Sequence, residues 1–310
     1  MSRPLVSFVI PTHNRAALLE RAIQSAKDAG AKAQVTVVDD CSTDDTPQLC
    51  SRIDGINYLR LSKNLGLSAA RNAGITNSSS EYIAFLDDDD LRLPETLGVQ
   101  LRALESNPSA AFCYGRCLIA ESRRQLPTGE VFPERLASGD VFWELLESNF
   151  IPMPTVVARR AALIEHGLFN TKLTAVEDWD MWLRLSERCA VVAVEEPVAI
   201  YRRANHESGQ MSQDVAGILK IQLGVQERAL KLTRARAATP ARRRQARRAL
   251  IASAHLTMVQ YAAKAMAEGD AKSARNKMRQ AFGFRPLRTV LSGRSWMMLA
   301  GTMANLNARQ

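Results

Sequence analysis

Short apolar runs alternate with amphipathic segments along the first 120 residues of the chain. The apolar runs are rich in β-branched residues and predict strands at residues 5–10, 35–40, 56–61 and 82–87. Helical spacing and helix-start residues predict helices at residues 16–29, 42–53, 66–75 and 94–106. This alternation predicts an α/β fold in which a mostly parallel sheet has helices on both faces.

The alternation weakens after residue 110. Further strands are predicted at residues 110–120, 154–160 and 195–203, and further helices at residues 138–148 and 175–187. Beyond residue 214 the chain is rich in alanine and arginine, with helical spacing and no strand pattern. The sequence therefore predicts an α/β body followed by a C-terminal helical extension.

Three polar clusters directly follow predicted strands: "PTHNR" at 11–15, "DDCSTDD" at 39–45 and "DDDD" at 87–90. In open α/β sheets, ligands bind at the carboxyl ends of the strands. Four adjacent carboxylates after a buried strand repel one another unless positive charge lies among them, and their hard oxygens suit a divalent metal. The alternative is a solvated acidic turn.

Composition narrows the class of protein. A hydrophobic content of 46% suits a globular chain with a sizeable core. No apolar run has the length of a membrane span, and no segment resembles a signal peptide. The five cysteines are scattered and odd in number, which predicts a reduced, cytoplasmic protein without structural disulfides.

Charge is divided unevenly along the chain. Residues 228–310 hold 18 lysines and arginines and two acids, which gives a net charge of +16. Because the whole chain has a net charge of +9, residues 1–227 have a net charge of −7. Apolar residues interleaved with arginines at 282–299 indicate peripheral contact with an anionic membrane surface through 213–310. Alternatively, the basic helices pack on the acidic body or form a dimer contact, and the sequence leaves the oligomeric state open.

Five motifs occur in order: "VSFVIPTHNR", "VVDDCSTDDT", "NLGLSAARNAGI", "YIAFLDDDD" and "EDWDMWLRL". Together they closely resemble the family 2 inverting glycosyltransferases, which have the GT-A fold, over about residues 4–204. The resemblance implies a catalytic domain at 1–212, with a nucleotide-sugar half at about 1–110 and an acceptor half at about 111–212. Residues 213–310 would then be a separate basic helical region.

The resemblance also implies an activity. The protein is expected to move one sugar, with inversion, from a UDP- or dTDP-sugar to an acceptor hydroxyl. The acceptor would be a glycan or a lipid-linked sugar in bacterial surface-glycan synthesis, at the inner face of the membrane. The family's processive synthases carry a QxxRW motif, which is absent here, so we expect transfer of single sugars.

Site residues follow from the motif positions. Asp40 is expected to accept a hydrogen bond from N3–H of uracil. The other residues expected in the nucleotide-sugar site are Pro11, Thr12, His13, Arg15, Arg71, Asp87, Asp88 and Glu177. Arg71 is expected near the phosphates, and its alternative is a surface arginine on an alanine-rich helix. For His13 and Arg15 the alternative is an ordinary polar loop.

The resemblance implies Mg²⁺ or Mn²⁺ as cofactor. Asp89 matches the position of the family's metal ligand, and Asp87 would contribute to the metal shell. His206 is a further candidate contact for the diphosphate or metal, or an ordinary loop histidine. Because Mg²⁺ typically takes one or two carboxylates plus phosphate oxygens, Asp90 is expected to face solvent or cap the next turn.

The general base is the remaining requirement, because a sugar hydroxyl is a poor nucleophile until a carboxylate accepts its proton. Asp178 matches the family's base position, and Glu177 beside it would contact the donor sugar or the acceptor. The alternative is that both carboxylates only favour the positive end of a helix dipole.

Rival functions fit the same residues less well. A haloacid-dehalogenase-like phosphatase has its Asp-x-Asp earlier in the chain and followed by Thr or Val, where this chain has Leu91. A nucleotidyltransferase that forms nucleotide sugars would need a glycine-rich phosphate loop, which residues 11–22 lack. A nucleic-acid-binding protein is the non-enzymatic alternative, but the basic tail has little aromatic interleaving for base stacking, so no nucleic acid is expected.

Overall fold

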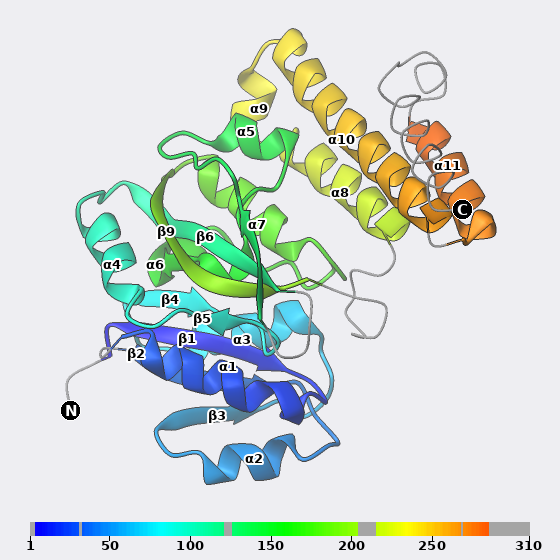
Figure 1. Ribbon diagram of the computed structural model, residues 1–310. Coiled ribbons are helices and arrows are strands. Elements are labelled where there is room, and N and C mark those ends of the chain that lie inside the picture. Colours follow the sequence, from blue (N-terminus) through cyan, green and yellow to red (C-terminus); the bar gives the residue numbers. More distant parts are fainter. Residues whose placement is uncertain (1–3, 31–32, 121–125, 204–214, 268, 285–310) are drawn as a thin grey trace. The chain divides into compact units, whose positions relative to one another are not determined.

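A computed structural model describes residues 4–30, 33–120, 126–203, 215–267 and 269–284 (Figure 1). The chain divides into two compact units, one formed by residues 1–145 and 149–213 and the other by residues 146–148 and 214–310. The division falls beside residue 213, where the basic helical region was expected to begin. The assignment of residues 1–212 to a catalytic domain and of 213–310 to a basic helical region remains a prediction.

A nine-stranded sheet forms the centre of the first unit. Its first four strands lie in the order β3 (Ile56–Arg60), β2 (Ala33–Asp39), β1 (Val6–Thr12) and β4 (Tyr82–Phe85). All three pairings among these strands are parallel. The predicted α/β sheet is therefore present, with its parallel character in this half.

The sheet becomes mixed beyond β4. It continues through β8 (Val157–Arg159), β6 (Ala110–Ala120), β9 (Ala190–Arg202) and β5 (Leu91–Arg92), and β7 (Pro127–Phe132) pairs with β6. β6 and β9 are parallel, whereas β8 runs antiparallel to both β4 and β6. β5 and β7 are also antiparallel to their partners. β6 and β9 therefore run in the same direction as β4, and the end of β9 lies beside the segment that follows β4, where the backbone N–H of Arg202 donates to Asp90.

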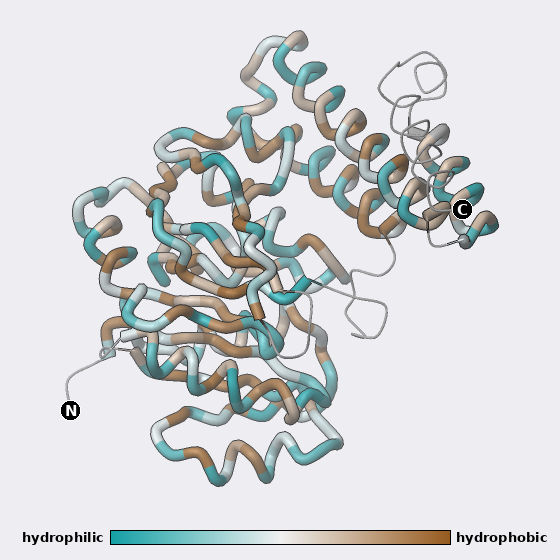
Figure 2. The backbone as a smooth tube through the Cα atoms, in the orientation of Figure 1, coloured by the Kyte–Doolittle hydropathy of each residue, from teal (hydrophilic) through white to brown (hydrophobic). Residues whose placement is uncertain are grey.

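Helices cover the sheet in the first unit (Figure 1). They are α1 (Ala16–Asp28), α2 (Thr46–Arg52), α3 (Leu67–Asn77), α4 (Leu97–Glu105), α5 (Phe142–Glu147), which ends in the second unit, α6 (Arg160–Glu165) and α7 (Glu177–Ser186); a 3₁₀ turn spans Met153–Thr155. Figure 2 shows the strands as mainly hydrophobic segments between more polar helices. Helix α3 approaches β1 so closely that a Cβ on Gly74 would lie 2.4 Å from Cγ1 of Val9.

Aromatic side chains fix α7 against the sheet. The rings of Phe112 and Trp182 have centroids 4.9 Å apart, and Phe85 meets Phe169 edge-on at 5.3 Å. Trp179 is fully buried and donates its indole N–H to the carbonyl of Leu145 at 2.7 Å. Because Phe85 ends β4, the same cluster supports both the first turn of α7 and the acidic segment that follows β4.

The second unit is helical, as expected for the extension. It contains α8 (Val215–Ala229), α9 (Thr233–Ala237), α10 (Pro240–Ala267) and α11 (Ala271–Phe284). A small core holds α8, α10 and α11 together, formed by Leu219, Ala254, Met258, Val259 and Ala281. Among the residues that the structure describes, no helix is both long and apolar enough to cross a membrane. Most of the apolar stretch expected to contact a membrane, residues 285–299, lies outside the described residues.

Candidate active site

Three polar segments meet at the carboxyl ends of β1, β2 and β4. The backbone N–H of Asp40 donates to the carbonyl of Thr12 at 2.9 Å, which joins the ends of β1 and β2. The hydroxyl of Thr12 donates to Asp88 Oδ2 at 2.8 Å, which joins β1 to the acidic segment. Pro11 lies buried in β1, opposite Val38. The predicted polar clusters thus lie together at one edge of the sheet.

Asp40 organises the loop that leads into α3. Its Oδ1 accepts the backbone N–H of Leu65, and its Oδ2 that of Gly66, both at 2.7 Å. Gly66 has a φ of 86°, a left-handed conformation that glycine adopts without strain. Each carboxylate oxygen keeps capacity for a further hydrogen bond, so Asp40 both shapes this loop and can accept from a ligand.

The tautomer of His13 follows from its neighbours. Its Nδ1 lies 2.7 Å from the carbonyl oxygen of Asp40 and must donate, because a carbonyl only accepts. Its Nε2 is then the acceptor for the side-chain amides of Asn14 and Asn64, at 3.2 and 3.1 Å. His13 therefore joins the ends of β1 and β2 to Asn64 through its two ring nitrogens.

Arginines neutralise the acidic segment Asp87–Asp90. Arg15 Nη1 lies 3.0 Å from Asp88 Oδ1 and 3.1 Å from Asp89 Oδ2. Arg202, at the end of β9, contacts the same Asp89 oxygen at 2.6 Å. Burial raises the pKa of Asp88 to about 7, although Arg15 opposes the rise. The arginines thus supply positive charge that the four carboxylates require.

Asp90 is buried, with 1% of its surface exposed, and its Oδ1 accepts the backbone N–H of Arg202 at 2.8 Å. The expectation that Asp90 faces solvent or caps the next turn was therefore wrong. Asp90 is buried because the end of β9 lies beside the segment after β4 and covers this carboxylate.

Arg71 is also buried, with 1% of its surface exposed, so the alternative of a surface arginine was wrong. Its Nη2 lies 2.5 Å from Asp87 Oδ1, and its Nη1 lies 2.5 Å from Glu177 Oε1. The guanidinium also stacks on the ring of Phe169, 5.6 Å from the centroid. Arg71 thus joins the acidic segment to the first turn of α7.

Asp178 lies half-buried in this first turn. Its Oδ2 accepts a hydrogen bond from Nδ2 of Asn149 at 3.2 Å. Burial, and after it the charge of Glu177, raise the pKa of Asp178 to about 7. A carboxylate that gains a proton near neutral pH has the proton affinity expected of a general base.

Three non-glycine residues beside the site adopt left-handed backbone conformations. Asn14 follows β1 with a φ of 55°, and Cys41 follows β2 with a φ of 63°. Val176 directly precedes Glu177 with a φ of 62° and a ψ of 21°. A β-branched residue is rarely found there, because its Cβ substituents clash with the backbone. The backbone directly before Glu177 is therefore strained at Val176.

Two site residues were missed from the sequence, Tyr201 and Arg202. Tyr201 is 36% exposed, yet burial and the nearby charges of Asp90, Asp87, Asp89 and Asp178 raise its pKa. Both residues lie in a predicted strand. The aspartates that they approach are far away in sequence, so no local sequence pattern predicts these contacts. His206 lies outside the described residues.

The oxygen donors of the acidic segment suit Mg²⁺ or Mn²⁺. Within the described part of the chain, no group of three or more His, Cys, Asp and Glu side chains is arranged to hold a metal ion. A divalent ion in this segment would therefore need further ligands, such as diphosphate oxygens and water. This is the usual pattern for Mg²⁺, so the residues fit the expected cofactor.

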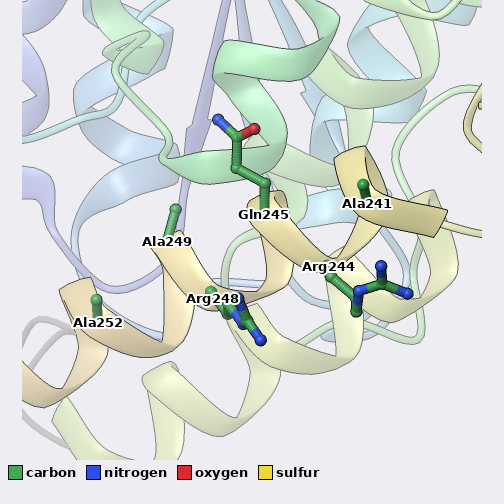
Figure 3. A pocket seen from close by; sticks show the side chains of 6 residues that line it. All are labelled: Ala241, Arg244, Gln245, Arg248, Ala249 and Ala252. Atoms are coloured by element: carbon green, nitrogen blue, oxygen red, sulfur yellow. The ribbon is translucent and has the colours of Figure 1, made fainter. Parts of the chain in front are cut away.

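A hollow on α10 is a separate feature (Figure 3). It is lined by Ala241, Arg244, Gln245, Arg248, Ala249 and Ala252. Its lining includes no carboxylate and no histidine, so it offers no general base for sugar transfer. The chemistry-bearing residues lie instead at the sheet edge of the first unit.

Comparison with known proteins finds a match between residues 7–167 and the family model described as Glycosyl transferase family 2. An uncharacterized glycosyltransferase of Rickettsia felis is 30% identical over 201 residues, which cover 64% of this chain and 33% of that protein. The succinoglycan biosynthesis protein ExoO of Rhizobium meliloti is 32% identical over 214 residues, covering 64% of this chain and 60% of that protein. The chain thus spans about a third of the rickettsial relative.

Solved structures share the fold. TarS 1–349 of S. aureus, in complex with UDP-GlcNAc, matches with a TM-score of 0.63 and 18% identity, over 95% of this chain and 83% of that one. The mannosyltransferase PcManGT of Pyrobaculum calidifontis, in complex with GDP-Man and Mn²⁺, matches with a TM-score of 0.61 and 18% identity, over 98% and 80%.

Proposed function

This chain belongs to glycosyl transferase family 2, and on that premise we propose that it transfers one sugar from a nucleotide-sugar donor to an acceptor hydroxyl with inversion. One observation carries the proposal. Asp178, whose pKa is raised to about 7, lies on the turn that Arg71 ties to the acidic segment through Glu177 and Asp87. Membership of the family disfavours the phosphatase, nucleotidyltransferase and nucleic-acid-binding alternatives.

In the proposed reaction, Asp178 accepts the proton of the acceptor hydroxyl while the hydroxyl oxygen bonds to the anomeric carbon of the donor. The bond from that carbon to the diphosphate oxygen breaks, and the nucleoside diphosphate leaves with the bonding electrons. Asp40, Thr12 and His13 line the nucleotide end, and a UDP- or dTDP-sugar is the proposed donor. A single displacement inverts the anomeric centre without a covalent enzyme intermediate.

Asp89 and Asp87 are the proposed ligands of Mg²⁺ or Mn²⁺. When bound, such an ion neutralises charge on the departing diphosphate. Support comes from the carboxylate donors of the segment and from the Mn²⁺ bound together with GDP-Man in the mannosyltransferase structure. Arg15 and Arg202 already contact Asp89, so they hold this carboxylate in place beside the proposed diphosphate position.

The function is tested by incubating the purified protein with a panel of UDP-, dTDP- and GDP-sugars, with Mg²⁺ or Mn²⁺. Release of nucleoside diphosphate identifies the donor. Once an acceptor is found, NMR of the product reports the anomeric configuration. Retention of configuration, or no metal-dependent turnover of any donor with any acceptor, would contradict the proposal.

The rate of transfer should depend on pH through Asp178. Because the base must be ionised, kcat should rise with pH and level off above about 7, the raised pKa of this carboxyl. The measurement is kcat between mildly acidic and mildly alkaline pH at saturating donor and metal. A flat profile across neutrality would contradict the assignment of Asp178 as base.

We also propose that the second unit contacts the inner face of an anionic membrane, which would bring the site to a lipid-linked acceptor. Residues 215–267 and 269–284 contain 15 lysines and arginines against two acids, Glu227 and Asp270. Glu227 is already paired with Arg247. Basic residues near such a surface contribute about 1 kcal/mol each, so a fraction of them suffices.

The full chain should sediment with vesicles that contain phosphatidylglycerol at low salt, and less as salt is added. Reversing Arg243→Glu and Arg244→Glu together on α10 should weaken vesicle binding by about tenfold or more. Reversing Lys63→Glu and Arg135→Glu, two exposed basic residues of the first unit, is the matched control and should have a much smaller effect. Membrane contact through the second unit would be contradicted if both double variants lost vesicle binding equally, or if the wild-type chain did not bind vesicles at low salt.

A further inference from the structure

Arg71 joins three separate elements of the first unit. It projects from α3 to Asp87, after β4, and to Glu177, in the first turn of α7, at 2.5 Å in each case. These partners are 16 and 106 residues away in sequence. With 1% of its surface exposed, the guanidinium has two of its nitrogens committed to carboxylates and its face committed to Phe169.

We propose that Arg71 is a positioning residue: by tying Asp87 to Glu177 it fixes the first turn of α7, and with it Asp178, beside the acidic segment. The proposal rests on the proposed function, because it assumes that Asp178 is the base. It differs from the expectation that Arg71 contacts the donor phosphates, since both of its terminal nitrogens are already bound to protein carboxylates.

Two hydrogen bonds hold the surroundings of Arg71 together. Asn72, the next residue of α3, donates its side-chain amide to the carbonyl of Phe169 at 2.9 Å and accepts the backbone N–H of Phe169 at 2.8 Å. The ring that lies under Arg71 is therefore fixed to α3 itself. In the first turn of α7, Val176 has a left-handed conformation directly before Glu177. The Arg71–Glu177 ion pair supplies a contact that keeps this strained turn in place.

The electrostatic consequence has a definite sign. The charged and titratable groups that act on Asp178 are Glu177 on its own helix, Arg71 on α3 and Tyr201 on β9, and Asn149 donates a neutral hydrogen bond. Glu177 raises the pKa of Asp178, and Arg71 lowers it. Removing Arg71 and removing Glu177 should therefore move the pH dependence of transfer in opposite directions.

The experiment compares kcat–pH profiles and donor KM for the wild type, Arg71→Met, Glu177→Gln and the double variant. The acidic limb is the range of pH in which kcat rises as Asp178 loses its proton. Arg71→Met should move this limb to higher pH and Glu177→Gln should move it to lower pH, by on the order of half a pH unit or more. The double variant should return toward the wild-type limb. In Arg71→Met, kcat should fall by about 10- to 100-fold, while the donor KM changes by less than about threefold.

Arg184→Met is the matched control, because Arg184 pairs with Asp180 on the same helix at 2.9 Å. It should leave the limb in place even where it lowers stability. If Arg71→Met does not fold, Glu177→Gln and Arg71→Lys decide: the former should move the limb to lower pH, and the latter, which keeps the charge, should leave it near the wild type.

The outcomes separate the two proposals. A wild-type chain that transfers no sugar contradicts the proposed function. If the wild type transfers sugar but the pH dependence of kcat in Glu177→Gln, and in Arg71→Met where it folds, matches that of Arg184→Met, the positioning role is overturned. A donor KM raised more than about tenfold in Arg71→Lys or Arg71→Met, with kcat unchanged, also overturns it and restores a phosphate contact.

Discussion

Replacing Asp178→Asn should lower sugar transfer by about 10²- to 10⁴-fold, because the acceptor hydroxyl loses the group that takes its proton. The amide has the size of the carboxylate, so the fold around Asn149 and Trp179 should persist. Donor binding depends on other residues and should change little. The measurements are kcat for transfer and the affinity for the nucleoside diphosphate by calorimetry.

Stability distinguishes loss of the base from loss of the fold. A carboxyl whose pKa is raised from 3.8 to about 7 by burial contributes stability that is full below 3.8 and is lost as pH rises through about 7. At pH 8, roughly one unit above that pKa, the wild-type carboxylate is charged and its burial lowers the stability of the fold. The amide of Asp178→Asn is neutral, so the variant does not lose this stability. Asp178→Asn should therefore unfold at an equal or higher temperature than the wild type.

Asp180→Asn is the matched control. Asp180 lies in the same turn but pairs with Arg184, so its replacement should lower stability and change transfer by only a few-fold. If Asp178→Asn transferred sugar at the wild-type rate, or if both variants lost activity equally, Asp178 would not be the base.

Replacing Asp89→Asn should lower transfer by about 10²-fold or more, because one proposed metal ligand loses its charge. Affinity for the nucleoside diphosphate should fall when Mn²⁺ is present and change far less when it is absent. The variant also leaves Arg202, which is 2% exposed, with a weaker partner. The free energy of unfolding should then fall by about 3–5 kcal/mol. The affinities of the wild type and the variant must therefore be compared at a temperature below the melting temperature of the variant.

Asp54→Asn, at an exposed position after α2, is the control and should alter neither quantity. If Asp89→Asn bound the diphosphate equally well with and without Mn²⁺, and the wild type did not, the ligand assignment would stand. Equal metal dependence in wild type and Asp89→Asn would contradict it.

The alternation of apolar runs and amphipathic segments was sufficient to predict the parallel half of the sheet and its helices. The elements it missed have physical reasons. β5 has two residues, α6 has six, and β7 is mostly exposed along its length, so none carries a readable period. The direction of β8 also depends on pairing across the sheet, which a local pattern does not encode.

The candidate site was predictable where it follows strand ends. Thr12, Asp40 and the acidic segment lie together because the carboxyl ends of parallel strands share one edge. The arginine contacts were not predictable. Arg202 meets Asp89 across 113 positions, and Arg71 meets Glu177 across 106, so motif positions alone did not show these ion pairs. For the same reason Asp90 was wrongly expected in solvent.

The left-handed turn at Val176 has a consequence for engineering this chain. Backbone strain of this kind costs about 1–3 kcal/mol, and a residue without a branched Cβ would relieve it. A screen for thermostability should therefore select Val176→Gly or Val176→Asn readily. Because this turn positions Glu177 and Asp178, such variants should have a higher melting temperature and a lower kcat. Activity would then be lost in exchange for stability at a residue that takes no part in the chemistry.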